Sequence, residues 1–146
     1  IASVLALAYV MNFSGQTVAM GTFLAGLGPV YAILAPALGW IGTAVTGSDT
    51  SANALFSKLQ VSAAENLHQA GISGATPELL LAANTTGGVV GKMISPQSLA
   101  IAATSVDMEG KESDILKAVV PWSFAMLVVV CILVFLQTNV LSFLIP

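Results

Sequence analysis

The sequence predicts an all-α integral membrane protein in which transmembrane helices accompany a re-entrant hairpin and a discontinuous, broken helix. Hydrophobic residues make up 56% of the 146-residue chain and charged residues only 8%, whereas about a quarter of the residues in an average soluble domain are charged. Residues 1–48 and 118–146 contain no charged side chain, and both stretches exceed the roughly 20 residues that cross a hydrocarbon core. Polar, glycine-containing segments interrupt the apolar sequence at residues 46–53 and 84–98.

Composition also argues against several classes of function. The net charge of −3 and the four lysines provide no basic patch for nucleic acid. The single histidine and the single cysteine belong to no metal-ligand set at a recognised spacing. No nucleophile–base pair of an enzyme is visible. We therefore expect no catalysis, no cofactor, no metal and no nucleic-acid partner.

The beginning of the chain indicates a longer protein. The sequence starts inside an apolar run and not with methionine, and the basic region of a signal peptide is absent from this run. Few spans fit into 146 residues. We therefore expect residues 1–146 to be the C-terminal part of one polytopic domain.

Residues 1–27 are predicted to form the first span. Polar side chains occur midway along it, at Asn12, Ser14, Gln16 and Thr17. Each polar group within lipid needs a hydrogen-bonding partner, so this polar belt should face other helices or a cavity.

Residues 30–58 are predicted to form a re-entrant hairpin whose tip lies near Asp49. The first half is apolar and ends before Gly47. Ser48 or Thr50 can then cap a new helix by accepting hydrogen bonds from its first amides. Apolar residues recur at helical spacing beyond this point, and the rest of that helix should emerge into the membrane interface.

Residues 77–106 are predicted to form a discontinuous transmembrane helix. Proline follows a capping residue at both Thr76 and Ser95, a pattern typical of helix starts. Three glycines, from Gly87 to Gly91, disfavour continuation of the first half. Each half of about ten residues is about 15 Å long, which places the break near the middle of a core of about 30 Å. Gly87 and Gly91 also have the GxxxG spacing of packed helices, but packing should be at most part of their role because they coincide with the predicted break.

Residues 118–141 are predicted to form the last span, a scaffold helix rich in valine, leucine, isoleucine and phenylalanine. Trp122 lies near one end, where aromatic residues anchor helices at the membrane interface. Cys131 falls in the same segment, and we interpret it as a small hydrophobic residue that faces lipid or a neighbouring helix.

The two polar interruptions form the candidate substrate-binding site. A helix start within the membrane carries unsatisfied amide donors and a partial positive charge, and transporters use broken helices to present such starts to a solute. Two convergent starts with neutral hydrogen-bonding side chains suit a small carboxylate that bears a hydroxyl group. The candidate residues are Ser48, Thr50, Ser51, Asn53, Asn84, Thr85, Thr86, Gly87, Gly88, Lys92, Ser95, Gln97 and Ser98.

Asp49 and Lys92 are the ionisable residues of these interruptions. A charged side chain at mid-bilayer costs about 2.5–3.5 kcal/mol on insertion scales, so such residues usually mark a pathway or a pair. We assign Lys92 to the substrate carboxylate and Asp49 to proton coupling. The alternatives are that Lys92 extends to a lipid headgroup and that Asp49 only caps the helix that begins near Ser51.

The segments TGSDTSANALFSKLQ (residues 46–60) and NTTGGVVGKMISPQSLAIA (residues 84–102) resemble the bacterial L-lactate permease family, and the resemblance extends over essentially the whole chain. It implies a multi-pass protein of the bacterial plasma (inner) membrane. It also implies secondary active transport, by proton-coupled symport, of L-lactate and related small 2-hydroxymonocarboxylates such as glycolate. The partners of this chain would then be lactate or glycolate, a proton, the lipid bilayer and the remaining N-terminal part of the same permease.

Two other functions stay open. A sodium-coupled carrier of di- or tricarboxylates also uses hairpins with Ser/Thr-rich tips, but the single Lys92 and the lack of arginine favour a monocarboxylate. A non-transporting membrane anchor subunit would have continuous apolar spans and would confine its polar motifs to loops. The glycine- and serine-rich interruptions at bilayer depth argue against that role.

Overall fold

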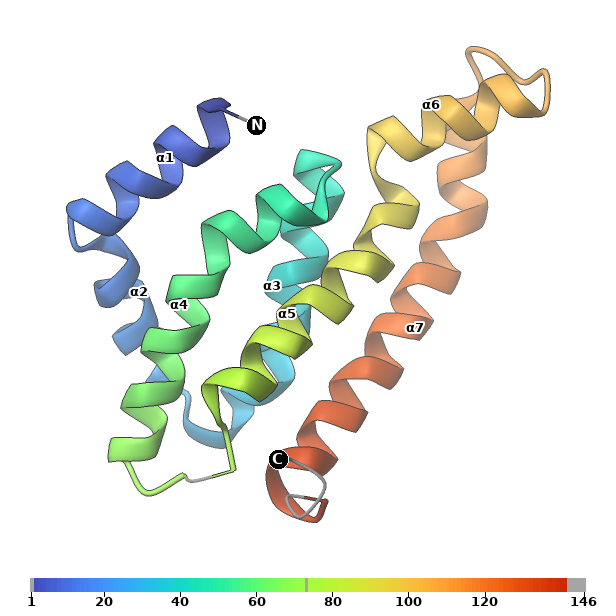
Figure 1. The fold of residues 1–146 in the computed structure, drawn as a ribbon. Coiled ribbons are helices and arrows are strands. Elements are labelled where there is room, and N and C mark those ends of the chain that lie inside the picture. The colour runs from blue at the N-terminus through green and yellow to red at the C-terminus, as the bar shows by residue number, and fades with distance from the viewer. Residues whose placement is uncertain (1, 73, 142–146) are drawn as a thin grey trace.

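The computed structural model describes residues 2–72 and 74–141, and within them it contains only helices joined by turns and short loops (Figure 1). This confirms the predicted all-α class. The elements in chain order are α1 (Ala2–Phe13), α2 (Gln16–Ala25), the 3-10 helix η1 (Gly28–Val30), α3 (Tyr31–Thr46), α4 (Asp49–Gln69), α5 (Pro77–Gly91), the 3-10 helix η2 (Lys92–Ile94), α6 (Pro96–Ser105) and α7 (Glu112–Asn139).

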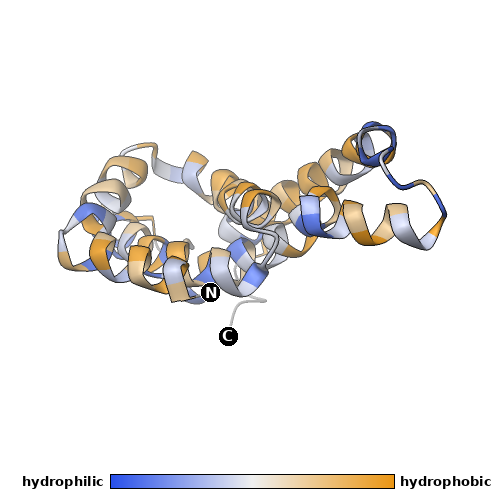
Figure 2. Ribbon diagram, turned by 90° about the horizontal axis from the view of Figure 1, so that it is seen from above, coloured by the Kyte–Doolittle hydropathy of each residue, from blue (hydrophilic) through white to orange (hydrophobic). Residues whose placement is uncertain are grey.

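Four helices, α3, α4, α5 and α7, make up most of the fold and alternate in direction along the chain (Figure 1). α3 packs against the other three, and its contact with α5 is the most extensive in the described structure. α1 and α2 pack on α4, at the side of the molecule opposite α7. Hydrophobic residues dominate the helices, and hydrophilic residues gather around the loop between α6 and α7 (Figure 2).

Two helices are long and apolar enough to cross a membrane, Gly28–Thr46 and Glu112–Asn139. α1 and α2 qualify as a further span only when taken together, because a bend of 72° separates them. The predicted first span, residues 1–27, is therefore interrupted at its polar belt. Gly15 permits the bend, since its φ of 76° lies in the left-handed region that glycine enters without strain. Thr17 Oγ1 donates to Asn12 Oδ1 at 2.8 Å, so two side chains of the belt satisfy each other.

The α3–α4 turn lies where the sequence predicts the tip of a hairpin. Gly47 ends α3 with a φ of 71°, and Ser48 caps α4 by accepting a hydrogen bond from the backbone amide of Ser51 at 3.3 Å. Beyond the predicted limit of residues 30–58, α4 continues to Gln69. The re-entrant character of this hairpin stays a prediction.

The break between α5 and α6 lies later than the glycines predict. α5 begins with the predicted Thr76 cap, whose Oγ1 accepts from the amide of Leu79 at 3.3 Å, but it continues through Gly87 and Gly88 to Gly91. The chain leaves the α-helical path only at η2 and restarts at the Ser95 cap. The expectation that the glycines interrupt the helix is wrong, although a discontinuity does follow them.

Packing explains why α5 tolerates its glycines. A Cβ on Gly87 would collide with the carbonyl oxygen of Pro36, and one on Gly91 would collide with that of Trp40. In the reverse direction, a Cβ on Gly39 of α3 would collide with the carbonyl oxygen of Asn84. A glycine costs up to about 1 kcal/mol in a helix relative to alanine, but here each one lets the backbones of α3 and α5 approach. The GxxxG spacing is thus a helix-packing motif, a role that the sequence interpretation gave too little weight.

α7 is fastened to both helices of this pair. Trp40 Nε1 donates to Ser123 Oγ at 2.9 Å, and Ser123 Oγ donates to the carbonyl oxygen of Val90 at 3.1 Å. Ser123 is fully buried, so these two hydrogen bonds connect α3, α7 and α5 at one point. The predicted last span, residues 118–141, falls almost entirely within α7, in accord with its assignment as a scaffold.

Candidate functional site

The two polar helix starts lie next to each other. Ser95 Oγ accepts from the amide of Ser98 at 3.3 Å, as Ser48 does for α4, and its hydroxyl donates to the carbonyl oxygen of Lys92 at 2.9 Å. A Cβ built on Gly47, just before the α4 cap, would lie 3.3 Å from Gln97 Oε1, just inside α6. The predicted convergence of the two starts is therefore present. The capping serines are engaged by their own helices, which leaves exposed neighbours to meet a solute.

A continuous row of polar side chains runs through the interior from α3 to the start of α4. Tyr31 Oη donates to Gln60 Oε1 at 2.6 Å, and Gln60 Nε2 donates to Asn84 Oδ1 at 3.2 Å. Asn84 Nδ2 donates to Asn53 Oδ1 at 2.8 Å, and Asn53 Nδ2 donates to Asp49 Oδ2 at 3.2 Å. Tyr31, Gln60 and Asn84 are fully buried, so this row, which we call the amide row, places three helices in register.

All four hydrogen bonds of the amide row point the same way. Each amide accepts through its oxygen and donates through its nitrogen. The direction follows from the two ends, because an ionised carboxylate only accepts hydrogen bonds and a tyrosine hydroxyl can donate. Asn53 must therefore turn its NH2 group toward Asp49, and this choice sets the orientation of the other two amides.

One oxygen of Asp49 is left out of this arrangement. Asp49 Oδ1 is buried and has no hydrogen-bond partner, and the same holds for Thr43 Oγ1 on α3. Both atoms border the same point, because a Cβ on Gly88 would collide with Asp49 Oδ1 and would lie 2.8 Å from Thr43 Oγ1. Buried polar atoms almost always have a partner, so two unpartnered oxygens at one point mark an unusual place in the fold.

The other predicted residues separate into distinct places. Thr85 Oγ1 donates to Asn53 Oδ1 at 3.2 Å and so joins the amide row. Thr86 faces the opposite way, into a groove between α5 and α7 that Gln137 also lines. Gly87 is occupied by helix packing. Asn53 and Asn84 are paired with each other and with their row neighbours, so they hold Asp49 in place and leave no amide free for a solute.

The exposed polar side chains at the two starts are Thr50, Lys92 and Gln97. Lys92 lies in η2, between the end of α5 and the Ser95 cap. Within the described residues the one ion pair joins Lys117 Nζ to Asp114 Oδ1 at 3.7 Å, so Lys92 has no charged partner there. Ser51 is buried behind the α4 cap.

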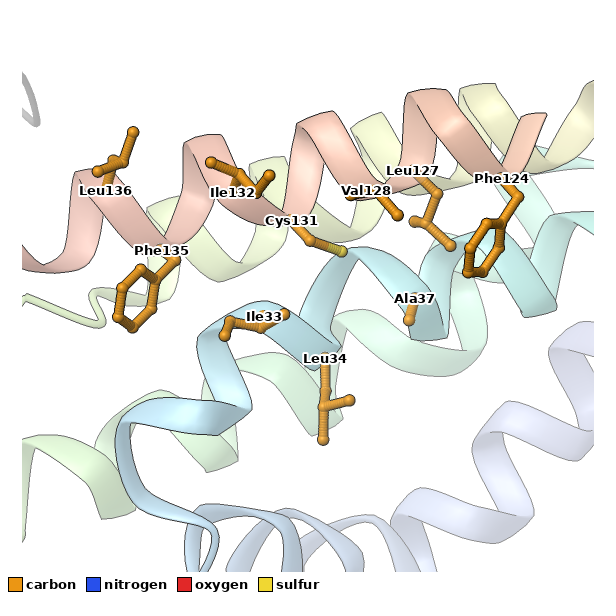
Figure 3. Close-up of a pocket in the computed structure, with 10 residues that line it drawn as sticks. All are labelled: Ile33, Leu34, Ala37, Phe124, Leu127, Val128, Cys131, Ile132, Phe135 and Leu136. Atoms are coloured by element: carbon orange, nitrogen blue, oxygen red, sulfur yellow. The ribbon is translucent and has the colours of Figure 1, made fainter. Parts of the chain in front are cut away.

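A different surface feature is an apolar groove between α3 and α7, with a volume of about 390 Å³ (Figure 3). Its walls are hydrocarbon side chains and Cys131, which points toward α3 as the sequence interpretation anticipated for a residue beside a neighbouring helix. A groove without polar groups cannot orient a hydroxy acid. The polar site and this groove are therefore unrelated.

The sequence interpretation missed Tyr31, Thr43 and Gln60. Tyr31 and Thr43 fall in an apolar segment, where they read as ordinary core positions. Gln60 had a detectable signal, because it follows Asp49 and Asn53 at the spacing i, i+4 and i+11, which places all three on one helix face.

Comparisons with known proteins agree on one family. The family model described as L-lactate permease matches residues 1–141. The chain is 47% identical over all 146 residues to the L-lactate permease of Bacillus subtilis (strain 168), and 46% identical over the same length to that of Escherichia coli (strain K12). It is 43% identical over 142 residues, 97% of its length, to the glycolate permease GlcA of Escherichia coli (strain K12). No solved structure matches.

The chain spans only about a quarter of the length of these relatives, with 25% of each lactate permease and 24% of the glycolate permease covered. The match nevertheless includes both polar interruptions, the amide row and the glycine-packed helix pair, since it extends over residues 1–141. With a family model that covers nearly all of its residues and relatives above 40% identity, this chain belongs to the L-lactate permease family.

Proposed function

We propose that this chain is the C-terminal part of a secondary active transporter that carries L-lactate and related small 2-hydroxymonocarboxylates, glycolate included, by symport with a proton. The transporter would be a multi-pass protein of the bacterial plasma (inner) membrane. Family membership supports the cargo, because relatives named for lactate and for glycolate match this chain at 47% and 43% identity. The two acids share a carboxylate and a 2-hydroxyl group, so one site can recognise both.

The observation that carries the coupling is Asp49. It is the only charged residue of α3, of the first two turns of α4 and of the interior half of α5, and one of its oxygens is buried without a partner. A carboxylate in such surroundings can exchange a proton when the site opens to one side of the membrane and then to the other. Asp49 is therefore our candidate for the residue that carries the proton.

For the solute, we propose the exposed groups at the two convergent helix starts. Lys92 would pair with the carboxylate, helped by the positive ends of α4 and α6, and Thr50 and Gln97 would bind the 2-hydroxyl group. The capping residues Ser48 and Ser95 would hold these starts in shape. Groups from the rest of the longer permease would complete the site.

Uptake of labelled L-lactate into proteoliposomes that contain the complete permease tests this function. Accumulation driven by an inward proton gradient, abolished by a protonophore and competed by glycolate, is the expected result. Accumulation that follows a sodium gradient and is competed by dicarboxylates would contradict the proposal in favour of a sodium-coupled carrier. A folded, oriented protein without any carboxylate flux would point to an anchor subunit.

Substitution of Lys92 by glutamine is expected to raise the lactate concentration for half-maximal uptake at least tenfold, because hydrogen bonds to charged groups contribute about 1.5–3 kcal/mol and each 1.4 kcal/mol is about tenfold. Initial rates measured over a range of lactate concentrations report the change. Lys58→Gln is the matched control, since Lys58 is an exposed lysine on the far part of α4. Equal concentration dependence in both variants would remove Lys92 from the site.

A further inference from the structure

We propose that Thr43 and Gly88 form, together with Asp49, the position at which the coupling proton is held. The proton resides on Asp49 Oδ1 and is donated in a hydrogen bond to Thr43 Oγ1, and Gly88 leaves the room that this contact needs. The inference rests on the proposed function, because it names the partners of the carboxylate to which that function assigns the proton.

Three helices supply the atoms of this position. Thr43 lies in the last turn of α3, Asp49 begins α4, and Gly88 lies one turn before the end of α5. Thr43 is fully buried, and its hydroxyl and Asp49 Oδ1 are the buried side-chain atoms of the described residues that have no hydrogen-bond partner. An unsatisfied buried oxygen is costly. One proton added between them satisfies both, since a carboxylic acid is a donor and a threonine oxygen accepts.

The amide row decides which carboxylate oxygen takes the proton. Asp49 Oδ2 already accepts a hydrogen bond from Asn53 Nδ2 at 3.2 Å. Asn53 in turn accepts from Asn84 at 2.8 Å and from Thr85 at 3.2 Å, so its NH2 group cannot be exchanged for an acceptor without breaking both bonds. Oδ2 therefore accepts in the ionised and in the protonated state alike. The proton is left with Oδ1, on the side of Thr43.

The charged surroundings of Asp49 are sparse on every element that packs around it. α3 has no acidic or basic residue, and its only titratable side chain, Tyr31, lies at the far end of the amide row. α5 carries only Glu78, at its opposite end, and Lys92 follows that helix. On α4 itself, Lys58, Glu65 and His68 lie two or more turns away, and α6 has no charged residue. Within the described structure Asp49 makes no ion pair.

The chemistry of this position favours a proton over a metal cation. Hard cations take about six or more oxygen ligands in proteins, whereas the two unpartnered atoms here are one carboxylate oxygen and one hydroxyl oxygen. The described residues also contain no cluster of three acidic, histidine or cysteine side chains that could hold a metal. Two facing oxygens are instead the complete requirement of a single O–H···O hydrogen bond.

The pH dependence of lactate uptake by the complete permease in proteoliposomes tests this inference. Thr43→Val keeps the side-chain volume and removes the hydroxyl group. The protonated state then loses its acceptor, while ionised Oδ1, which has no partner in the structure, loses nothing. We expect half-maximal uptake at a pH about one unit lower than in the wild type, the shift that corresponds to one hydrogen bond. Thr43→Ser, which keeps the hydroxyl group, is expected to retain the wild-type profile.

Thr104→Val provides the matched control. Thr104 is exposed on α6, and its hydroxyl group donates only to the carbonyl oxygen of Ala100, at 3.0 Å. Thr43→Ala removes the same acceptor without filling space and serves if the valine variant does not fold. A wild-type pH profile in a folded Thr43→Val or Thr43→Ala variant, or a shifted profile in Thr43→Ser, overturns the inference. Wild-type uptake that ignores the proton gradient overturns the proposed function itself, so the two failures are distinguishable.

Discussion

Replacement of Asp49 by asparagine is expected to abolish the accumulation of lactate against its concentration gradient. Asparagine keeps the size of the side chain and can still accept from Asn53 through its carbonyl oxygen, but it cannot take up and release a proton. Net uptake driven by an inward proton gradient should therefore stop at equilibration. Exchange of internal for external lactate, which requires no net proton movement, should continue. Parallel measurements of gradient-driven uptake and of exchange in the same proteoliposomes separate these two results.

Glu65→Gln is the control for this experiment. Glu65 lies on the same helix as Asp49 but is exposed, four turns further along, so the same chemical change there should leave gradient-driven accumulation intact. Accumulation by Asp49→Asn at the wild-type level would show that another residue carries the proton. Loss of exchange together with accumulation would assign Asp49 to solute binding instead.

Substitution of Gly87 by valine is expected to prevent the folding of the transporter. The new Cβ would collide with the backbone carbonyl of Pro36, and neither helix can move aside because Gly39 and Gly91 form similar contacts on both sides. Overpacking of a tight interface costs about 3 kcal/mol or more. The amount of monodisperse protein after detergent extraction, with its thermal unfolding midpoint, should fall sharply.

Ala82→Val is the matched control on the same helix. Ala82 is exposed and lines the groove between α5 and α7, so two additional carbon atoms meet open space there. Its yield and unfolding midpoint should resemble those of the wild type. A Gly87→Val protein as stable as Ala82→Val would contradict the close packing of α3 on α5.

Local signals in the sequence predicted where the helices begin. Thr76 and Ser95 each precede a proline, and Ser48 follows a helix-ending glycine, so these starts depend on residues that are adjacent in the chain. The end of α5 could not be predicted in the same way. A glycine disfavours an isolated helix, but whether it interrupts a helix or packs one depends on the neighbour it meets. The carbonyl groups of Pro36 and Trp40 come from another part of the sequence.

The site was predicted to the same extent. Asp49 and the polar interruptions stand out by composition alone, because charge is rare in this chain. The pairing of Asn53 with Asn84 crosses 31 positions of sequence, and the contribution of Thr43 exists only because α3, α4 and α5 meet at Gly88. Residue type therefore indicates which side chains are unusual. It does not indicate whether they face a solute or one another.

The one-way order of the amide row has a mechanical consequence. Rotation of any single amide would bring donor against donor on one side and acceptor against acceptor on the other, so the row cannot be dismantled one bond at a time. α3, α4 and α5 must consequently travel as one rigid body during a transport cycle. The hinges of that motion belong outside this body, at the bend around Gly15 and in the loop that joins α6 to α7.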